Sequence, residues 1–282
     1  MKTFQILILL LLSFNIFGLF DDYEPSPRAR AMGGTFYSTS DDANGIFYNP
    51  AGLSLAENNL AVSYTKLFDN DFQVLNTVAF TMNLPKNFGT FGLGLLAMDV
   101  DYLNVNLMSE KIYAVAHSFT LLKDVHSSIY FGYAANFYHL CINSFGNQTS
   151  FGLNLGAVAI LHQRTRLGFA VSNLNNPKIG EDNQHSLPRK IGMGISYIPY
   201  EGVTTSLELK KTLSDRIKSE TEVHAGTEIE VLKYLILRFG VRNKPSSYSM
   251  GARFELFNVY IDYAYNTHVL DATHHFGVGY KF

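Results

Sequence analysis

The sequence predicts an all-β protein, a transmembrane antiparallel β-barrel of about fourteen strands with an N-terminal hatch or plug segment. Three observations support this fold class. Apolar and polar residues alternate with a period of two from Leu60 to the C-terminus, as in strands with two different faces. The connections between these segments are alternately short and long. Only 16% of the residues are charged, against about 25% in an ordinary soluble domain.

Composition also excludes several classes of function. The 282-residue chain has 22 basic and 24 acidic side chains, and a formal net charge of −2 offers no basic field for nucleic acid. The single cysteine, Cys141, excludes an internal disulfide framework and a cysteine-based zinc cluster.

Residues 1–20 are the first of three predicted domains, a signal peptide. Lys2 is followed by a largely apolar run from Ile6 to Phe20, which is the layout of a secretory leader. A retained helical anchor is the alternative, because about 20 apolar residues can span a membrane. The end of the run has no clear A-x-A motif, so the sequence leaves the cleavage site open.

Residues 21–59 differ in character and are predicted to form the hatch or plug. Gly, Asn, Asp and Pro are frequent in this segment, and no period of two appears. A short helix is expected near Ser40–Tyr48, with Ser40 or Asp41 as its N-cap. Such a segment can fill the lumen of a barrel.

Residues 60–282 are predicted to supply the barrel strands. Leu237 and Phe239 share one face of a strand, whereas Arg238 and Arg242 share the other. A sheet in lipid must close on itself, so the apolar face should meet lipid and the polar face the lumen. A soluble sandwich or propeller is the alternative. The charged residues assigned to the lumen, which could also simply pair across neighbouring strands, are Glu222, Glu228, Glu230, Arg238, Arg242, Arg253 and Glu255.

The final strand ends on an aromatic residue. Phe276, Val278, Tyr280 and Phe282 alternate up to the last position. This pattern resembles the C-terminal signal that the barrel-assembly machinery of bacteria reads. It predicts a multi-pass barrel in the outer membrane, with that machinery and membrane lipid as partners.

Motifs within residues 21–59 resemble those of a known family. The pattern R-A-x-x-M-G-G begins at Arg28, D-D-A begins at Asp41, and N-P-A-G-L begins at Asn49. With the leader, the strand number and the final aromatic residue, they resemble the FadL-like outer-membrane proteins, which include the long-chain fatty-acid transporter and the PorV/PorQ group. The resemblance implies a barrel plugged by an N-terminal hatch. The hatch or gate residues that it implies are Arg30, Met32, Gly33, Gly34, Asp41, Asp42, Asn49, Pro50, Ala51 and Gly52.

The two branches of this family imply different functions. The transporter branch implies uptake of hydrophobic small molecules, with the hatch as gate and release through a gap in the barrel wall. Gly89, Gly92 and Gly94 are candidates for that gap, because glycine inside a strand often marks a bend. Alternatively, these glycines only leave room for the hatch. The PorV/PorQ branch implies an accessory role in type IX protein secretion, docking cargo or secretion-system proteins without solute transport.

The sequence predicts neither an enzyme nor a bound cofactor or metal. A G-x-G-x-x-A match at Gly92 lies inside an alternating strand, whereas a dinucleotide site needs a following helix. His268, His274 and His275 have no carboxylate at fixed spacing beyond Asp271, so they are expected to be surface residues. No motif supports a Ser–His hydrolase.

Overall fold

The computed structural model describes residues 19–20, 23–103, 105–143, 146–180, 184–213 and 221–282. Most of the predicted signal peptide, residues 1–18, lies outside this part of the chain. No helix within the described residues is long and apolar enough to cross a membrane.

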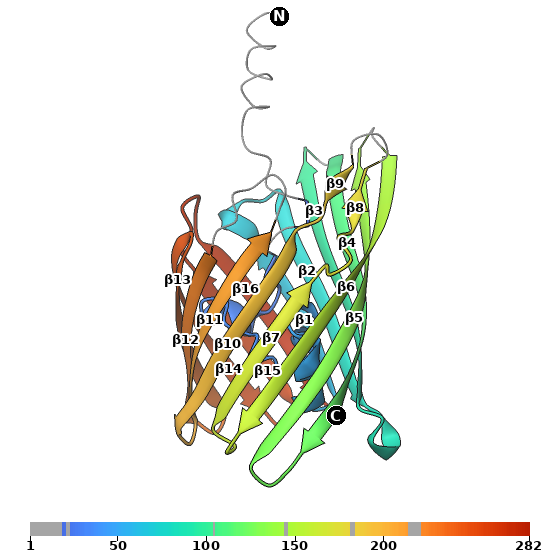
Figure 1. Cartoon of the computed structure of the whole chain (residues 1–282). Helices are drawn as coiled ribbons and strands as arrows, with labels where there is room; N and C mark the ends of the chain where they lie inside the picture. Colours follow the sequence, from blue (N-terminus) through green and yellow to red (C-terminus); the bar gives the residue numbers. More distant parts are fainter. Residues whose placement is uncertain (1–18, 21–22, 104, 144–145, 181–183, 214–220) are drawn as a thin grey trace, which may run out of the picture.

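Fourteen strands of the described chain form one closed antiparallel barrel, which confirms the predicted fold class (Figure 1). Neighbouring strands follow one another along the chain, and β1 pairs with β16 to close the barrel. A separate two-stranded sheet, β8 (Lys178–Ile179) with β9 (His185–Ser186), lies between β7 and β10. The barrel strands are β1 (Asn59–Lys66), β2 (Gln73–Asn83), β3 (Thr90–Tyr102), β4 (Val105–Lys123), β5 (Ser127–Ile142), β6 (Gly146–Leu161), β7 (Thr165–Ser172), β10 (Arg189–Tyr200), β11 (Val203–Leu213), β12 (Thr221–Leu232), β13 (Leu235–Asn243), β14 (Ser246–Leu256), β15 (Val259–Asn266) and β16 (Thr273–Lys281).

The two faces of the sheet differ as the alternation predicts. On β13, the side chain of Phe239 is 50% exposed on the outer surface, whereas the next inward side chain, Arg238, is 1% exposed. Phe276, Val278, Tyr280 and Phe282 are likewise exposed on the outside. An apolar outer surface around a closed sheet is the arrangement that lipid requires of a spanning β-structure.

The barrel wall is taller on one side than on the other. β4 has 19 residues and its neighbours β5 and β6 have 16 each, whereas β7 has only 8. The connections 67–72, 173–188 and 267–272 join strands at the end that is uppermost in Figure 1, here called the upper end. Phe20, from the first described residues, packs near this end against Leu140 of β5 and Ile179.

The N-terminal segment, residues 23–58, lies inside the barrel (Figure 1). It contains the α-helix α2 (Pro27–Ala31) and the 3₁₀-helices η1 (Ala43–Phe47) and η2 (Pro50–Leu55). The helix expected near Ser40–Tyr48 is therefore a shorter 3₁₀-helix. Its N-cap is Asp42, whose Oδ1 accepts the N–H of Asn44 at 2.9 Å, and neither Ser40 nor Asp41 caps it. The carboxylate of Asp41 instead binds arginine, as described below.

Candidate functional site in the barrel lumen

Arg28 is the centre of an ion-pair network between the N-terminal segment and the barrel. It lies on α2, whose N-cap Ser26 accepts the N–H of Ala29. Its guanidinium binds Asp41 at 2.5 Å within the segment and Glu228 of β12 at 2.9 Å in the wall. Arg166 of β7 also binds Asp41, at 2.6 Å. Burial acts to raise the pKa of Asp41, but the two guanidiniums, Arg28 first, hold that pKa well below its usual range.

The same network continues around the wall. Arg238 of β13 binds Glu228 at 2.6 Å and Asp262 of β15 at 2.7 Å. Arg253 of β14 completes the chain by binding Asp262 at 2.7 Å. Buried charges require such compensation, because removing one partner leaves the other charge unpaired in a medium of low dielectric.

A second ionic contact lies around Glu24. Its carboxylate binds Arg30 on α2 at 2.8 Å, Lys210 of β11 at 3.1 Å and Arg242 of β13 at 3.7 Å. The side chain of Glu24 is buried, and these cations balance its charge. The segment is therefore held to β11–β15 by charge at two places.

Packing takes the place of charge on the opposite wall. Ile46 of η1 and Leu53 of η2 are fully buried against small inward-facing side chains of β1, β2, β4 and β5. The wall residues of this cluster are Ala61, Ala79, Ala114, Ala116 and Ala134. Small side chains let the backbone of the segment approach the strands closely.

The N-P-A motif fixes η2 against this wall. Asn49 caps η2 through its Oδ1, which accepts the N–H of Ala51. Its Nδ2 donates to the carbonyls of Tyr37 (2.7 Å) and of Ala157 on β6 (3.2 Å). A Cβ at Gly156 would lie only 2.0 Å from Asn49 Oδ1, so this wall position requires glycine.

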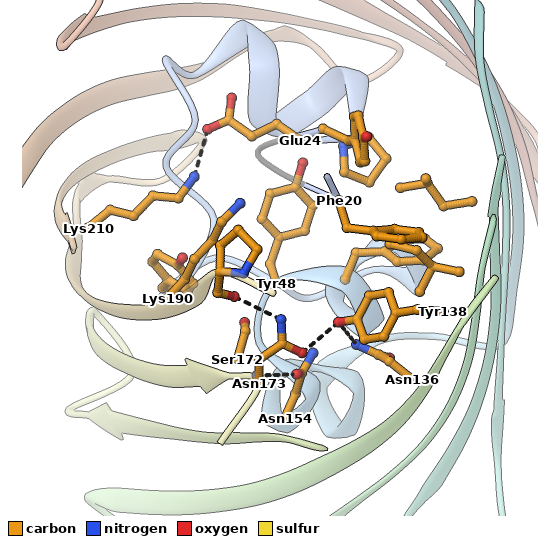
Figure 2. Close-up of a pocket in the computed structure, with 17 residues that line it drawn as sticks. Phe20, Glu24, Tyr48, Asn136, Tyr138, Asn154, Ser172, Asn173, Lys190 and Lys210 are labelled. Atoms are coloured by element: carbon orange, nitrogen blue, oxygen red, sulfur yellow. Dashed lines mark hydrogen bonds and ion pairs between the residues drawn. The ribbon is translucent and has the colours of Figure 1, made fainter. Parts of the chain in front are cut away.

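A cavity of about 90 Å³ lies between the N-terminal segment and the wall (Figure 2). Uncharged polar side chains form one of its surfaces: Asn136 and Tyr138 of β5, Asn154 of β6 and Asn173 after β7. An apolar surface consists of Phe20, Phe47, Leu96 and Ile112. The volume is sufficient for several water molecules or one small organic molecule, since about 10–15 Å³ holds one water.

No family model and no curated protein matches the sequence. Solved barrels do match its fold. The CymD monoaromatic hydrocarbon channel is 14% identical with a TM-score of 0.65, and the match covers 96% of this chain and 99% of that chain. The P. putida toluene transporter TodX is 12% identical with a TM-score of 0.61, covering 93% and 99%. A Pseudomonas aeruginosa FadL homologue is 12% identical with a TM-score of 0.62, covering 95% and 99%.

The chain has the FadL-type barrel fold. This finding confirms the fold that the motifs at Arg28, Asp41 and Asn49 imply. With its closed sheet and its apolar outer surface, this FadL-type barrel is a multi-pass protein of the outer membrane.

Two of the three glycines proposed for a lateral gap lie within β3, and the third lies just before it. Gly89 precedes β3 and has φ +87°, so it is a turn residue and no part of the strand. Gly92 and Gly94 lie within β3, which pairs without a register shift with β2 and, up to Val100, with β4. A Cβ at either position would lie 2.9 Å from a side chain of the N-terminal segment. These contacts fit the alternative interpretation, in which the glycines leave room for the segment.

The remaining predicted residues separate into paired and peripheral groups. Glu222 binds His224, and Glu255 binds Lys281 at 2.5 Å, whereas Glu230 is exposed near the end of β12. His275, expected on the surface, is fully buried between Thr65 and Asn266, because an inward position in β16 faces the lumen.

Gly33 and Gly34 lie where the segment contacts β12 and β13. Both have a positive φ, at +71° and +90°. A Cβ on Gly33 would lie 2.7 Å from the backbone of Val241, and one on Gly34 would lie 2.8 Å from Glu24 and His224. Met32 is fully buried, whereas Pro50, Ala51 and Gly52 belong to η2.

Sequence reasoning missed an apolar part of the lumen. Leu75, Leu96, Met98 and Leu140 point inward near the upper end and are nearly fully buried, although the lumen face was expected to be polar. In this region the alternation is reversed, because Asn76, Asp99 and His139 occupy outward positions next to these inward apolar side chains. The sequence signal for this part of the lumen is that reversal, in which Leu75 and Leu140 stand next to the polar Asn76 and His139.

Proposed function

We propose that this FadL-type barrel takes up small hydrophobic molecules across the outer membrane. The observation that carries the proposal is the apolar inward surface of β2–β5 near the upper end, which adjoins the cavity at Leu96 and Ile112. Long connections lie on the outer side of bacterial barrels, so this apolar region would lie at the end of the barrel that an incoming molecule reaches first. Structural neighbours described as a monoaromatic hydrocarbon channel and as a toluene transporter support this proposal.

The N-terminal segment would be the gate. Tyr37, Phe47 and Tyr48 of this segment line the cavity. Ion pairs and close packing hold the segment against both walls of the lumen, so a molecule that passes through the barrel requires the segment to move. The proposed division of the chain is a signal peptide at residues 1–20, a hatch at 21–59 and a barrel at 60–282.

Deletion of residues 28–53 tests both parts of the proposal. The deletion should increase the uptake of labelled toluene by liposomes that contain the protein, because it removes most of the segment that packs inside the barrel. Retention of the heat-modifiable gel shift of a folded barrel is the control. Unchanged permeability in a folded deletion variant would refute the gate.

An accessory role in type IX protein secretion, as in PorV/PorQ barrels, is the second candidate. Ion pairs between the N-terminal segment and the wall close part of the lumen. This arrangement favours the accessory role, since a barrel that only docks other proteins needs no open path. A stable complex with secretion components and the loss of surface cargo on gene deletion would support it. Saturable binding of apolar ligands would instead support uptake.

The barrel-assembly machinery is the expected partner during insertion. Phe276, Val278, Tyr280 and Phe282 form an apolar row on the outside of β16, next to the β1 closure. Deletion of Phe282 should therefore reduce the amount of folded barrel in the outer membrane. Undiminished assembly would contradict a role for this row as a targeting signal.

A further inference from the structure

The polar surface of the cavity is a network of uncharged groups. Tyr138 donates its hydroxyl proton to Asn173 Oδ1 at 2.7 Å. Asn173 in turn donates from Nδ2 to the carbonyl of Pro188 at 2.8 Å, and its backbone N–H donates to Asn154 Oδ1 at 2.9 Å. Figure 2 shows these side chains grouped together below Tyr48, on one side of the cavity.

Asn136 is the member of this network with an unused acceptor. Its Nδ2 donates to the hydroxyl oxygen of Tyr138 at 3.3 Å. Its Oδ1 has no hydrogen-bond partner among the described residues, although the residue is only 6% exposed. The Tyr138 proton is already committed to Asn173, so it cannot satisfy this oxygen. A buried acceptor without a donor is costly, and such a group indicates a missing partner.

The rest of the cavity defines the chemistry of that partner. The ring of Phe20 contacts the ring of Tyr138 edge to face, with centroids 5.0 Å apart, and Leu96 and Ile112 extend the apolar surface. A ligand that matches both surfaces has an apolar body and one O–H or N–H donor. The χ2 torsion of asparagine is broad, so the Asn136 amide can turn its oxygen toward a donor in the cavity.

Charge favours a neutral ligand on this side. The four side chains of the network are Asn or Tyr, and each is uncharged at neutral pH. Lys190 and Lys210 also line the cavity; Lys190 pairs in register with Ser172, next to Asn173, and Lys210 binds Glu24. A carboxylate would find its counter-ions at these lysines, whereas the unused acceptor of Asn136 requires a donor.

We propose that this cavity selects small apolar molecules that carry a neutral hydroxyl, such as phenols, over the corresponding hydrocarbons. The inference rests on the proposed uptake function and specifies its substrate class. Asn136 accepts the hydroxyl proton of the ligand, and the apolar surface holds its ring. A site that hydrogen-bonds a substrate hydroxyl discriminates against the analogue without it, because the buried polar group is then left unpaired.

Binding of three matched probes to the full-length protein in detergent tests this inference by titration calorimetry. The probes are p-cresol, toluene and p-toluate, which differ only in hydroxyl, hydrogen or carboxylate on a methyl-substituted ring. The wild-type protein should bind p-cresol about tenfold more tightly than toluene, as expected for one buried hydrogen bond. Asn136→Leu should reduce this ratio to about one without weakening the binding of toluene.

Asn147→Leu is the matched control, because it makes the same chemical change at an exposed position of β6 outside the cavity. This variant should keep the wild-type ratio, and all proteins should show the heat-modifiable gel shift. Equal binding of p-cresol and toluene to the wild-type protein would overturn the inference but leave uptake standing. Tightest binding of p-toluate, or a ratio unchanged in Asn136→Leu, would also overturn it. Binding of none of the probes would refute the proposed function as well.

Discussion

The two walls of the barrel hold the N-terminal segment by different physical means. β12 and its neighbours bind it through charge, above all through Arg28 and Glu228. β1–β5 bind it through close contact of Ile46 and Leu53 with alanine and glycine. Ion pairs respond to pH and can be broken one at a time, whereas packing tolerates little change in shape. We infer that the N-terminal segment is released from the charged wall and stays in place against the packed wall.

Arg28→Met should have the largest effect. It leaves Asp41 and Glu228 with fewer cations in a buried site, and such a loss typically costs about 3–5 kcal/mol. Toluene uptake should rise and the heat-modifiable form should melt at a lower temperature. Arg28→Lys keeps the charge and should give an intermediate result. Wild-type uptake and melting in Arg28→Met would mean that charge does not hold the segment.

Gly132→Val tests the packed wall and should have the next largest effect. A Cβ at Gly132 would lie 2.5 Å from the backbone of Pro50 and Ala51. Overpacking of this kind costs about 1–3 kcal/mol. Melting of the folded barrel in detergent should show the loss, and Ala135→Val, on the outer face of the same strand, should not. Equal melting of the two variants would contradict close packing at η2.

A pH dependence should be the smallest effect and should arise on the charged wall alone. Because Arg28 and Arg166 lower the pKa of Asp41 against the effect of burial, its pairing stabilises the docked segment above the ordinary Asp value of about 4. That contribution is lost as the pH falls from this value toward the lower pKa of the docked state. Uptake should therefore rise below about pH 4. Asp41→Asn should have raised uptake at pH 7 and a smaller rise below about pH 4, because only the Glu228 pair with Arg28 then remains to titrate, and a profile like that of the wild type would exclude Asp41.

The sequence predicts the barrel well because period-two alternation is local. Leu237 and Arg238 occupy opposite faces whatever their distant neighbours are. The pairing of Arg28 with Glu228 is different, since these residues are far apart in the chain and meet only when the barrel closes. The same holds for Asn136 of β5 and Asn173 after β7, which both bind the hydroxyl of Tyr138. Gly92 and Gly94 show the converse, since the local pattern predicts a bend or room for the hatch, and the structure adds a close contact with a distant segment.

A reversible crosslink between the segment and the wall tests the central claim most directly. Thr35 and Ser206 of β11 are joined by a hydrogen bond of 2.8 Å between their hydroxyls, so cysteines at both positions lie close together. In a Cys141→Ser background, oxidation of Thr35→Cys/Ser206→Cys should reduce toluene uptake by liposomes at least about tenfold, and a reductant should restore it. Equal uptake by the oxidised and reduced protein would contradict a mobile segment that gates the lumen.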